Sequence, residues 1–163
     1  MRIVTTGIAA LFLSFGSGGR TKALERLPRC AAAQLVGRSD WVRLDQGAGF
    51  FLSLPACFQP DEEGAPRYVH GGRRWRCRAA TAEIVWGMWG TGSFPSECRT
   101  VLAGVPVMVA RPARDAATVR AWYLTGAIHE PLIVVSSTEA ADLPLLTTIA
   151  YAGELSVSRG PNR

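Results

Sequence analysis

The segment from residue 74 to residue 88 alternates with a two-residue period, and this pattern constrains the fold more than any other feature of the chain. From Ala80 to Met88 the apolar residues move to even positions, so a bulge or a turn is required near residues 79–80, and we expect a bulge. The glycines and the proline of residues 90–95 then predict a loop. The polar face before the phase change carries Arg74, Arg76 and Arg78, and the apolar face carries Trp75, Cys77 and Ala79.

Several other short segments have strand character. We expect strands over residues 50–54, ending at Pro55, over residues 101–109 and over residues 118–125. Pro106 lacks an N–H, so its strand should lie at a sheet edge or carry a bulge there. Residues 132–136 are apolar throughout and are the best candidate for the sheet centre. A turn at residues 71–72 would join residues 68–70 to residues 75–78 as a hairpin.

The last element differs in period and predicts a helix within residues 139–152. Ser136 and Glu139 have capping-box spacing, and Asp142 followed by Pro144 offers a second start. Gly153 is expected to stop the helix. The apolar stripe of this helix is Leu143, Leu146, Ile149 and Ala150. The predicted fold class is therefore α+β, a mostly antiparallel β-sheet with a C-terminal helix packed on it.

The N-terminal residues 3–15 form an apolar run after a basic residue, which is typical of a secretory signal. The alternatives are a buried strand or helix, or a start codon assigned too early. The run is shorter than the roughly 20 residues of a transmembrane helix, so we expect no membrane span in the mature chain. The predicted organisation is a signal-like segment 1–19, a linker or arm 20–40, a domain 41–155 and a disordered tail 156–163.

Four cysteines are an even number, which fits export to the periplasm or secretion, where disulfides persist. Three pairings are possible, and we prefer Cys77–Cys98, because both cysteines flank one predicted hairpin, together with Cys30–Cys57. The alternative is four reduced, buried cysteines in a cytosolic protein. We expect no metal site and no cofactor, since there is no CxxC motif and His70 stands seven residues before Cys77.

Positive charge is carried almost entirely by arginine, with a net charge of +5. The arginine strand, which we define as Arg74, Arg76 and Arg78, could bind an anion or an acidic partner, or it could be a solvated strand face. Its arginines and aromatics lie on opposite faces, so specific nucleic-acid binding is not expected. Trp86 and Trp89 also fall on opposite faces; one should pack in the core, and Trp89 is the candidate contact anchor.

A catalytic site is weakly indicated. His129, Ser137 and Asp142 could form a triad, yet no GxSxG motif is present. Glu83 is framed by core-like residues and is expected to be buried and paired. The acidic residues 61–63 lack the spacing of a calcium loop and are expected to be solvated.

From residue 50 to residue 155 the order of elements resembles the Mog1/PsbP-like α/β sandwich domains. The resemblance is carried by FFLSLP, by the strand pair VPVMVA and VRAWYLT, and by LIVVSS followed by DLPLLTTIA. It implies a non-catalytic module and supplies no catalytic residues. We therefore expect an exported binding or assembly module of the bacterial cell envelope, whose partner is a protein or an anionic envelope polymer. The alternatives are a small serine hydrolase using His129 and Ser137, or an anionic-polymer binder using the arginine strand.

Overall fold

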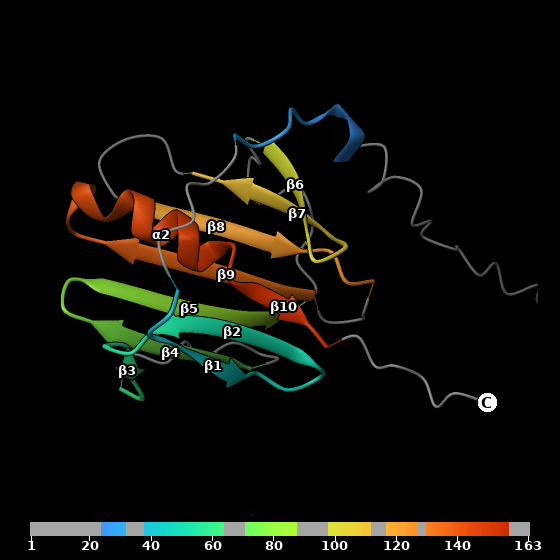
Figure 1. Ribbon diagram of the computed structural model, residues 1–163. Helices are drawn as coiled ribbons and strands as arrows, with labels where there is room; N and C mark the ends of the chain where they lie inside the picture. Colours follow the sequence, from blue (N-terminus) through green and yellow to red (C-terminus); the bar gives the residue numbers. More distant parts are fainter. Residues whose placement is uncertain are drawn as a thin grey trace, which may run out of the picture.

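The computed structural model describes residues 24–31, 38–63, 71–87, 98–111, 117–126 and 130–156, and these residues form two antiparallel sheets and a helix (Figure 1). The larger sheet has the strand order β3-β4-β5-β9-β8-β7-β6, and the smaller has the order β1-β2-β10. The strands are β1 Trp41–Asp45, β2 Phe50–Pro55, β3 Gln59–Pro60, β4 Gly72–Cys77, β5 Ala80–Gly87, β6 Cys98–Leu102, β7 Val105–Ala110, β8 Ala117–Tyr123, β9 Glu130–Ser137 and β10 Gly153–Leu155.

Strand β9 lies at the centre of the larger sheet, between β5 and β8, as its apolar sequence predicts. Both of its faces are covered. Ile133 and Val135 belong to the main core, while Leu132 packs in a second cluster with Val85 and Trp122. A strand that is buried on both faces must be apolar at consecutive positions, which explains the unbroken run at residues 132–135.

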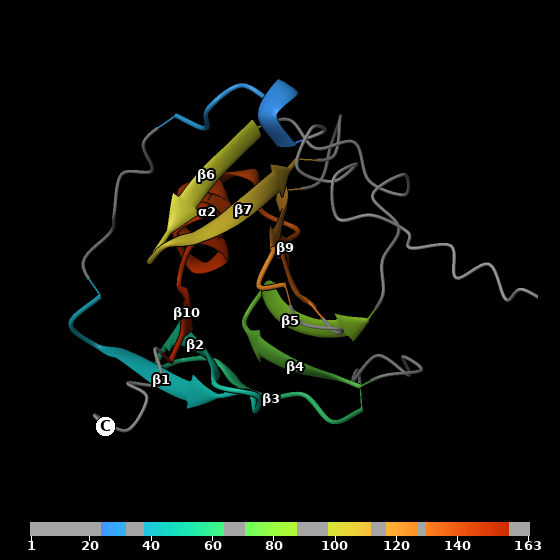
Figure 2. The same ribbon diagram turned by 90° about the vertical axis from the view of Figure 1, so that its right-hand side faces the viewer.

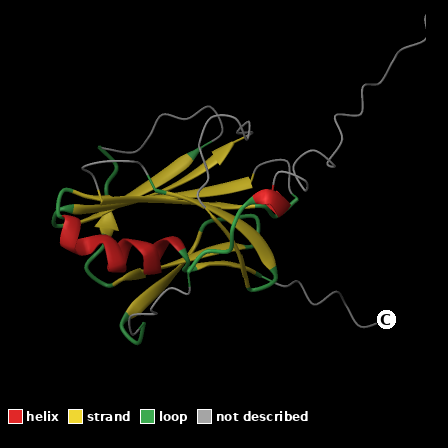
Figure 3. Cartoon of the chain, turned by 90° about the horizontal axis from the view of Figure 1, so that it is seen from above, coloured by secondary structure: helices red, strands yellow, loops and turns green. Residues whose placement is uncertain are grey.

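The main core fills the space enclosed by the two sheets and the C-terminal helix. In the end-on view of Figure 2 these elements surround a common interior, and Figure 3 shows the helix lying along one face of the larger sheet. The helix, α2 (Leu143–Ala150), packs against β8 and β9. The predicted α+β class, with a C-terminal helix on a mostly antiparallel sheet, is confirmed.

Helix α2 follows a 3₁₀ turn, η1 (Ala140–Asp142), and buries Leu146 and Ile149 completely. The predicted capping box of Ser136 and Glu139 does not form, because β9 continues through Ser137. The second predicted start is confirmed, since α2 begins directly after Asp142 with Pro144 in its first turn, although Asp142 makes no side-chain capping bond. The Ser137 hydroxyl instead accepts a hydrogen bond from the Glu139 N–H (3.0 Å) and donates one to Asp142 Oδ2 (2.5 Å). Ser137 therefore orders the connection between strand and helix.

The sequence predicted that Gly153 stops the helix, but α2 ends at Ala150 with Tyr151 as its C-cap, and Gly153 begins β10. A Cβ atom at Gly153 would lie 2.6 Å from Cζ of Tyr123 and 2.7 Å from Cζ of Phe50. Real Cβ atoms do not approach other atoms so closely, so the glycine is required by close packing between the small sheet and β8.

Two hairpin turns were also mispredicted. The expected bulge at residues 79–80 is a tight turn, in which Arg78 adopts a φ of 53° and leads β4 into β5. Residues 101–109 do not form one strand, because Ala103 (φ 49°) and Gly104 (φ 82°) turn β6 back onto β7. Two successive residues with positive φ are typical of a type I′ hairpin turn.

Pro106 lies within the sheet rather than at its edge, because β7 is flanked by β6 and β8. Its carbonyl accepts a hydrogen bond from Leu124 N–H at 2.9 Å, just beyond the last residue pair of the β7–β8 ladder, Val107 with Tyr123. The missing proline N–H therefore costs at most one bond at the end of a ladder.

The predicted disulfide pairing is wrong, although all four cysteines are bonded. The disulfides join Cys30 to Cys98 and Cys57 to Cys77, with Cα–Cα distances of 4.9 and 5.5 Å. Strand β5 pairs with β9 and not with β6, so Cys77 and Cys98 are separated by the width of five strand spacings. At about 4.8 Å per spacing this distance is far beyond the reach of a disulfide.

Residues 24–31, which we call the arm, run along the β6 end of the larger sheet. Leu24 and Leu27 pack against the second apolar cluster, and Cys30 ties the arm to β6. The signal-like residues 1–19 and the tail from residue 157 lie outside the described residues, as do the first residues of the predicted 68–70 hairpin. Within the described part of the chain, no helix is long and apolar enough to cross a membrane.

Candidate binding site at the β6 edge

The arginine strand predicted as an anion site is largely neutralised by carboxylates of its own fold. Arg76 Nη2 lies 3.0 Å from Asp61 Oδ2, and Arg74 Nε lies 3.3 Å from Glu83 Oε1. The side chains of Asp61 and Glu83 are only 14% and 19% exposed, so these pairs are partly shielded from water. The prediction that Glu83 is paired is confirmed, whereas the prediction that it is buried is not, since it is only half-buried.

Arg78, the third member of the arginine strand, sits in the β4–β5 turn rather than on a strand face. It lines a broad surface hollow together with Arg76 and two acidic residues, Asp61 and Glu63. Two arginines and two carboxylates line this hollow, so it presents no uniformly positive surface. The arginine strand is therefore a poor anion receptor in the folded protein.

The catalytic hypothesis depends on residues that the structure describes only in part. His129, His70 and Trp89 lie outside the described residues. Ser137 is 5% exposed, and its hydroxyl bonds directly to the Asp142 carboxylate. In a working triad an imidazole stands between the serine and the acid.

Trp86 is half-buried against the main core and meets the Phe50 ring edge-on at 5.8 Å.

A different pair of arginines lies at the other end of the larger sheet. The arm forms an isolated parallel bridge to β6 between Arg29 and Arg99. Two backbone hydrogen bonds make this bridge, from Arg99 N–H to Pro28 O and from Cys30 N–H to Arg99 O, both 2.8 Å. Paired residues of neighbouring strands direct their side chains to the same face, so the bridge holds Arg29 and Arg99 side by side.

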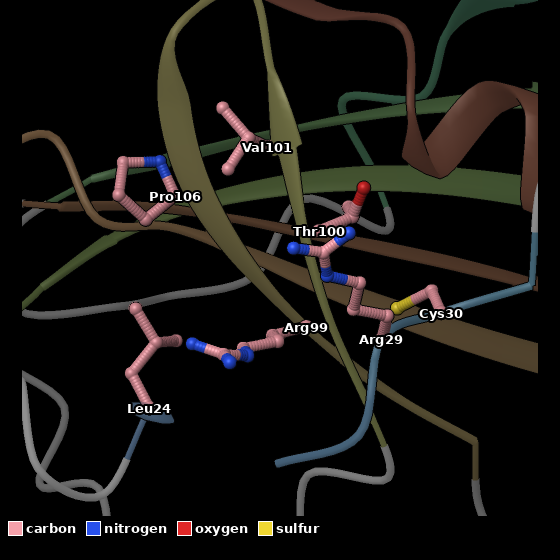
Figure 4. A pocket seen from close by; sticks show the side chains of 7 residues that line it. All are labelled: Leu24, Arg29, Cys30, Arg99, Thr100, Val101 and Pro106. Carbon is pink, nitrogen blue, oxygen red and sulfur yellow. The ribbon is translucent and has the colours of Figure 1, made fainter. Parts of the chain in front are cut away.

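These two guanidinium groups line a cavity of about 470 Å³, which we call the first cavity. Figure 4 shows Arg99 extending toward Leu24, Arg29 reaching toward Thr100, and Val101 and Pro106 on the opposite side. The volume falls within the range of ordinary ligand sites, and the lining combines apolar groups with a few polar ones. The described residues that line it are Leu24, Arg29, Cys30, Arg99, Thr100, Val101 and Pro106.

The electrostatics of the first cavity differ from those of the arginine strand. Among the residues that the structure describes, no acidic residue lines it. Within the described part of the chain, neither Arg29 nor Arg99 makes a side-chain hydrogen bond or an ion pair. Like charges placed opposite each other across a bridge repel, so an anion between them would relieve an unfavourable contact.

A second cavity of about 400 Å³ shares Cys30, Thr100 and Val101 with the first and extends toward β10. Arg38, Tyr151 and Glu154 also line it. Burial raises the pKa of the Tyr151 phenol, and the charge of Arg111 opposes this effect. Glu154 is paired with Arg43 at 3.2 Å, which leaves Arg38 to contribute positive charge.

Val101 lines both cavities. Its side chain is 65% exposed, and the other exposed large apolar residue in the described part of the chain, Val42, is 49% exposed. The strand edge beside Val101 therefore combines an exposed apolar side chain, two hollows and three arginines. Sequence reasoning missed this site because it placed Cys30 and Cys98 in different disulfides. A usable signal was present, since Arg29 and Arg99 directly flank two of the cysteines.

The fold and the site together define an α+β protein with two disulfides and a positively charged cleft at a sheet edge. No protein-family model matches the chain, and no curated protein matches it significantly. The chemistry of the site must therefore carry the functional inference.

Proposed function

We propose that the chain is an exported, non-catalytic binding or assembly module of the bacterial cell envelope, and that it binds its partner at the β6 edge. The observation that carries this proposal is the Arg29–Arg99 pair, held side by side in a cavity whose described lining includes no acidic residue. A surface that keeps two like charges adjacent is suited to an anionic partner.

The compartment is supported by the cysteines. Both disulfides join elements that are distant in the chain, 68 and 20 residues apart. Such bonds persist in the periplasm or outside the cell and are rare in the cytosol. A secretory role for residues 1–19 and a relationship to the Mog1/PsbP-like domains belong to the same proposal.

The described residues favour binding over hydrolysis. Ser137 uses its hydroxyl to order the start of the helical segment and is almost fully buried. The arginine strand, which was the alternative polymer-binding surface, carries Asp61 and Glu83 among its arginines. The β6 edge has an excess of positive charge, and this difference supports the β6 edge over the arginine strand as the binding surface.

Export can be tested by producing the full chain, with its own N-terminus, in a Gram-negative host. We expect the protein in the periplasm, shortened by about its first 19 residues. Peptide mapping without reductant should find Cys30 linked to Cys98 and Cys57 to Cys77. Recovery of the full-length chain from the cytosol with four free thiols would contradict export.

Binding can be tested with a benzophenone photo-crosslinking side chain placed at Val101 in the organism that produces the protein. We expect a discrete crosslinked product that disappears when Arg29 and Arg99 are both changed to glutamine. The matched control is the same crosslinker at Val42, an exposed valine on the edge of the other sheet. Equal products from both positions, or none from Val101, would refute binding at the β6 edge.

A further inference from the structure

The outer edge of β6 is only partly covered by the arm. Alternate residues of a strand direct their backbone groups to the same side, and Arg99 directs both of its groups to the arm. Val101, two residues further on, therefore directs its N–H and C=O to the same outer edge. A continued ladder would join Val101 N–H to Cys30 O, and the described part of the chain contains no such bond.

The two cavities flank this open position on opposite faces of the sheet. The first cavity contains Arg99 and Pro106, and the second contains Leu102 and Tyr151. Successive side chains of an extended peptide point to opposite faces, so a strand laid along Val101 would direct neighbouring side chains into the two hollows. The edge thus offers backbone pairing together with pockets for alternate side chains.

We infer that the β6 edge accepts an extended acidic peptide segment of a partner protein as an added strand, with a carboxylate side chain between Arg29 and Arg99. This inference rests on the proposed binding function and specifies its ligand. Each guanidinium can donate two parallel hydrogen bonds to a carboxylate. The apolar residues Leu24, Val101 and Pro106 would exclude water from that contact.

Charge complementarity distinguishes this occupant from others. Arg29, Arg99 and Arg38 leave the edge with an excess of positive charge, since Glu154 of the second cavity is paired with Arg43. A second copy of the chain would therefore bring positive charge to a positive edge. A small free anion could use the guanidinium groups but not the backbone groups or the exposed side chain of Val101. An acidic strand uses all of these features at once.

The test begins with a phage-displayed library of random ten-residue peptides, selected on the folded, disulfide-bonded chain. We expect the enriched peptides to share an acidic residue flanked by β-branched residues, because these residues favour extended backbone. Enrichment without an acidic residue would overturn the inference, and so would the absence of any enrichment.

The best peptide is then titrated against variants by calorimetry. Val101→Pro removes the outward N–H and leaves the pairing with β7 intact, since the backbone groups of Val101 point away from β7. We expect at least a tenfold loss of affinity for Val101→Pro and for Arg99→Gln. The matched control Arg76→Gln removes an equal charge from the arginine strand and should change affinity less than twofold.

Full affinity in Val101→Pro, or binding of acetate or inorganic phosphate as tight as that of the peptide, would show anion capture and overturn strand addition. If Val101→Pro fails to fold, a scan of single backbone N-methylations along the peptide gives the same information from the ligand side. At least one methylated position must lose binding, and a scan without any loss overturns the inference. A crosslink at Val101 to a partner that lacks an acidic extended segment would overturn it while preserving the proposed binding function.

Discussion

At the scale of single residues, the Tyr123 hydroxyl joins three elements. It donates a hydrogen bond to Ala150 O at the end of α2 (2.8 Å) and accepts one from Gly153 N–H at the start of β10 (3.0 Å). Tyr123→Phe would leave these buried backbone groups unsatisfied, so the free energy of unfolding should fall by about 1–3 kcal/mol in urea denaturation. The matched control is Tyr151→Phe, whose hydroxyl makes no hydrogen bond within the described part of the chain, and a similar loss there would refute this role.

Tyr123 also predicts how stability depends on pH. Burial raises the pKa of its phenol well above the ordinary value, although the hydrogen bond from Gly153 opposes the shift. Above pH of about 10 the unfolded chain releases this proton while the folded chain keeps it. The free energy of unfolding should then decrease by up to about 1.4 kcal/mol per pH unit, and the decrease should be smaller in Tyr123→Phe. Denaturation curves from pH 8 to pH 11 measure both slopes, and equal slopes would contradict the assignment.

Residue patterns in the sequence predicted burial better than they predicted partners. The alternation correctly placed Trp75 in the core and Arg74 and Arg76 on the other face. Gly153 was predicted to end the helix, because glycine is common just after a helix. In the structure a glycine is required there for a different reason, since any side chain would collide with the rings of Tyr123 and Phe50. Close approach between segments that are distant in the chain leaves no local pattern, so only the fold could reveal it.

At the scale of elements, the β6–β7 turn is not optimal in sequence. Ala103 adopts a φ of 49°, a conformation that asparagine tolerates better than alanine. Ala103→Asn would create the Asn-Gly pair favoured in type I′ turns and should raise the free energy of unfolding by about 0.5–1 kcal/mol. The control is Ala56→Asn, at an exposed position without positive φ, which should have little effect. A destabilised Ala103→Asn would show that the turn type is wrong.

Elements with a strong local signal were predicted correctly. Strand β9 was predicted from its apolar run, β8 from its aromatic and β-branched residues, and α2 from its apolar stripe. The Ala103–Gly104 turn was missed because valines on either side fit one continuous alternation. The turn in fact reverses the phase, since Val101 pairs with Pro106 and so lies on the face opposite to Val105, but one valine before the turn was too little to reveal the change.

The arm is held chiefly by its disulfide. Without Cys30–Cys98, the arm would keep the apolar contacts of Leu24 and Leu27 and two backbone hydrogen bonds of about 0.5–1.5 kcal/mol each. Ordering its eight residues costs about 1–2 kcal/mol per residue, so we expect the bridge at Arg99 to open often. In a Cys30→Ser/Cys98→Ser variant we expect the Arg99 amide to exchange its hydrogen far faster, while amides of β9 stay protected. Hydrogen exchange read by NMR measures this effect. Cys57→Ser/Cys77→Ser is the matched control, and protection of Arg99 that survives loss of Cys30–Cys98 would refute the assignment.

At the scale of the whole molecule, the same arginine-rich composition produces two surfaces of different character. The β4 end of the larger sheet carries Asp61 and Glu83 among its arginines. The β6 end carries Arg29 and Arg99 in a cavity that no acidic residue of the described part of the chain lines. The sequence revealed the number of arginines but not which of them are paired with carboxylates. Asp61 precedes its partner Arg76 by 15 residues, and Arg29 lies beside Arg99 only because the arm is linked to β6 by a disulfide. The candidate site was therefore unpredictable without the correct cysteine pairing.

This division of charge predicts how the folded protein interacts with a polyanion. We expect Arg29→Gln/Arg99→Gln to elute from a heparin column at clearly lower salt than Arg74→Gln/Arg76→Gln. Both variants lower the formal net charge by two, from +5 to +3, so total charge cannot explain a difference. The expected difference comes from the neighbouring groups. Arg74 and Arg76 already form ion pairs with Glu83 and Asp61, whereas Arg29 and Arg99 can release counterions when a polyanion binds. Equal elution of the two variants would mean that heparin senses only net charge, and a larger effect at Arg74 and Arg76 would restore the arginine strand as the anionic-polymer surface.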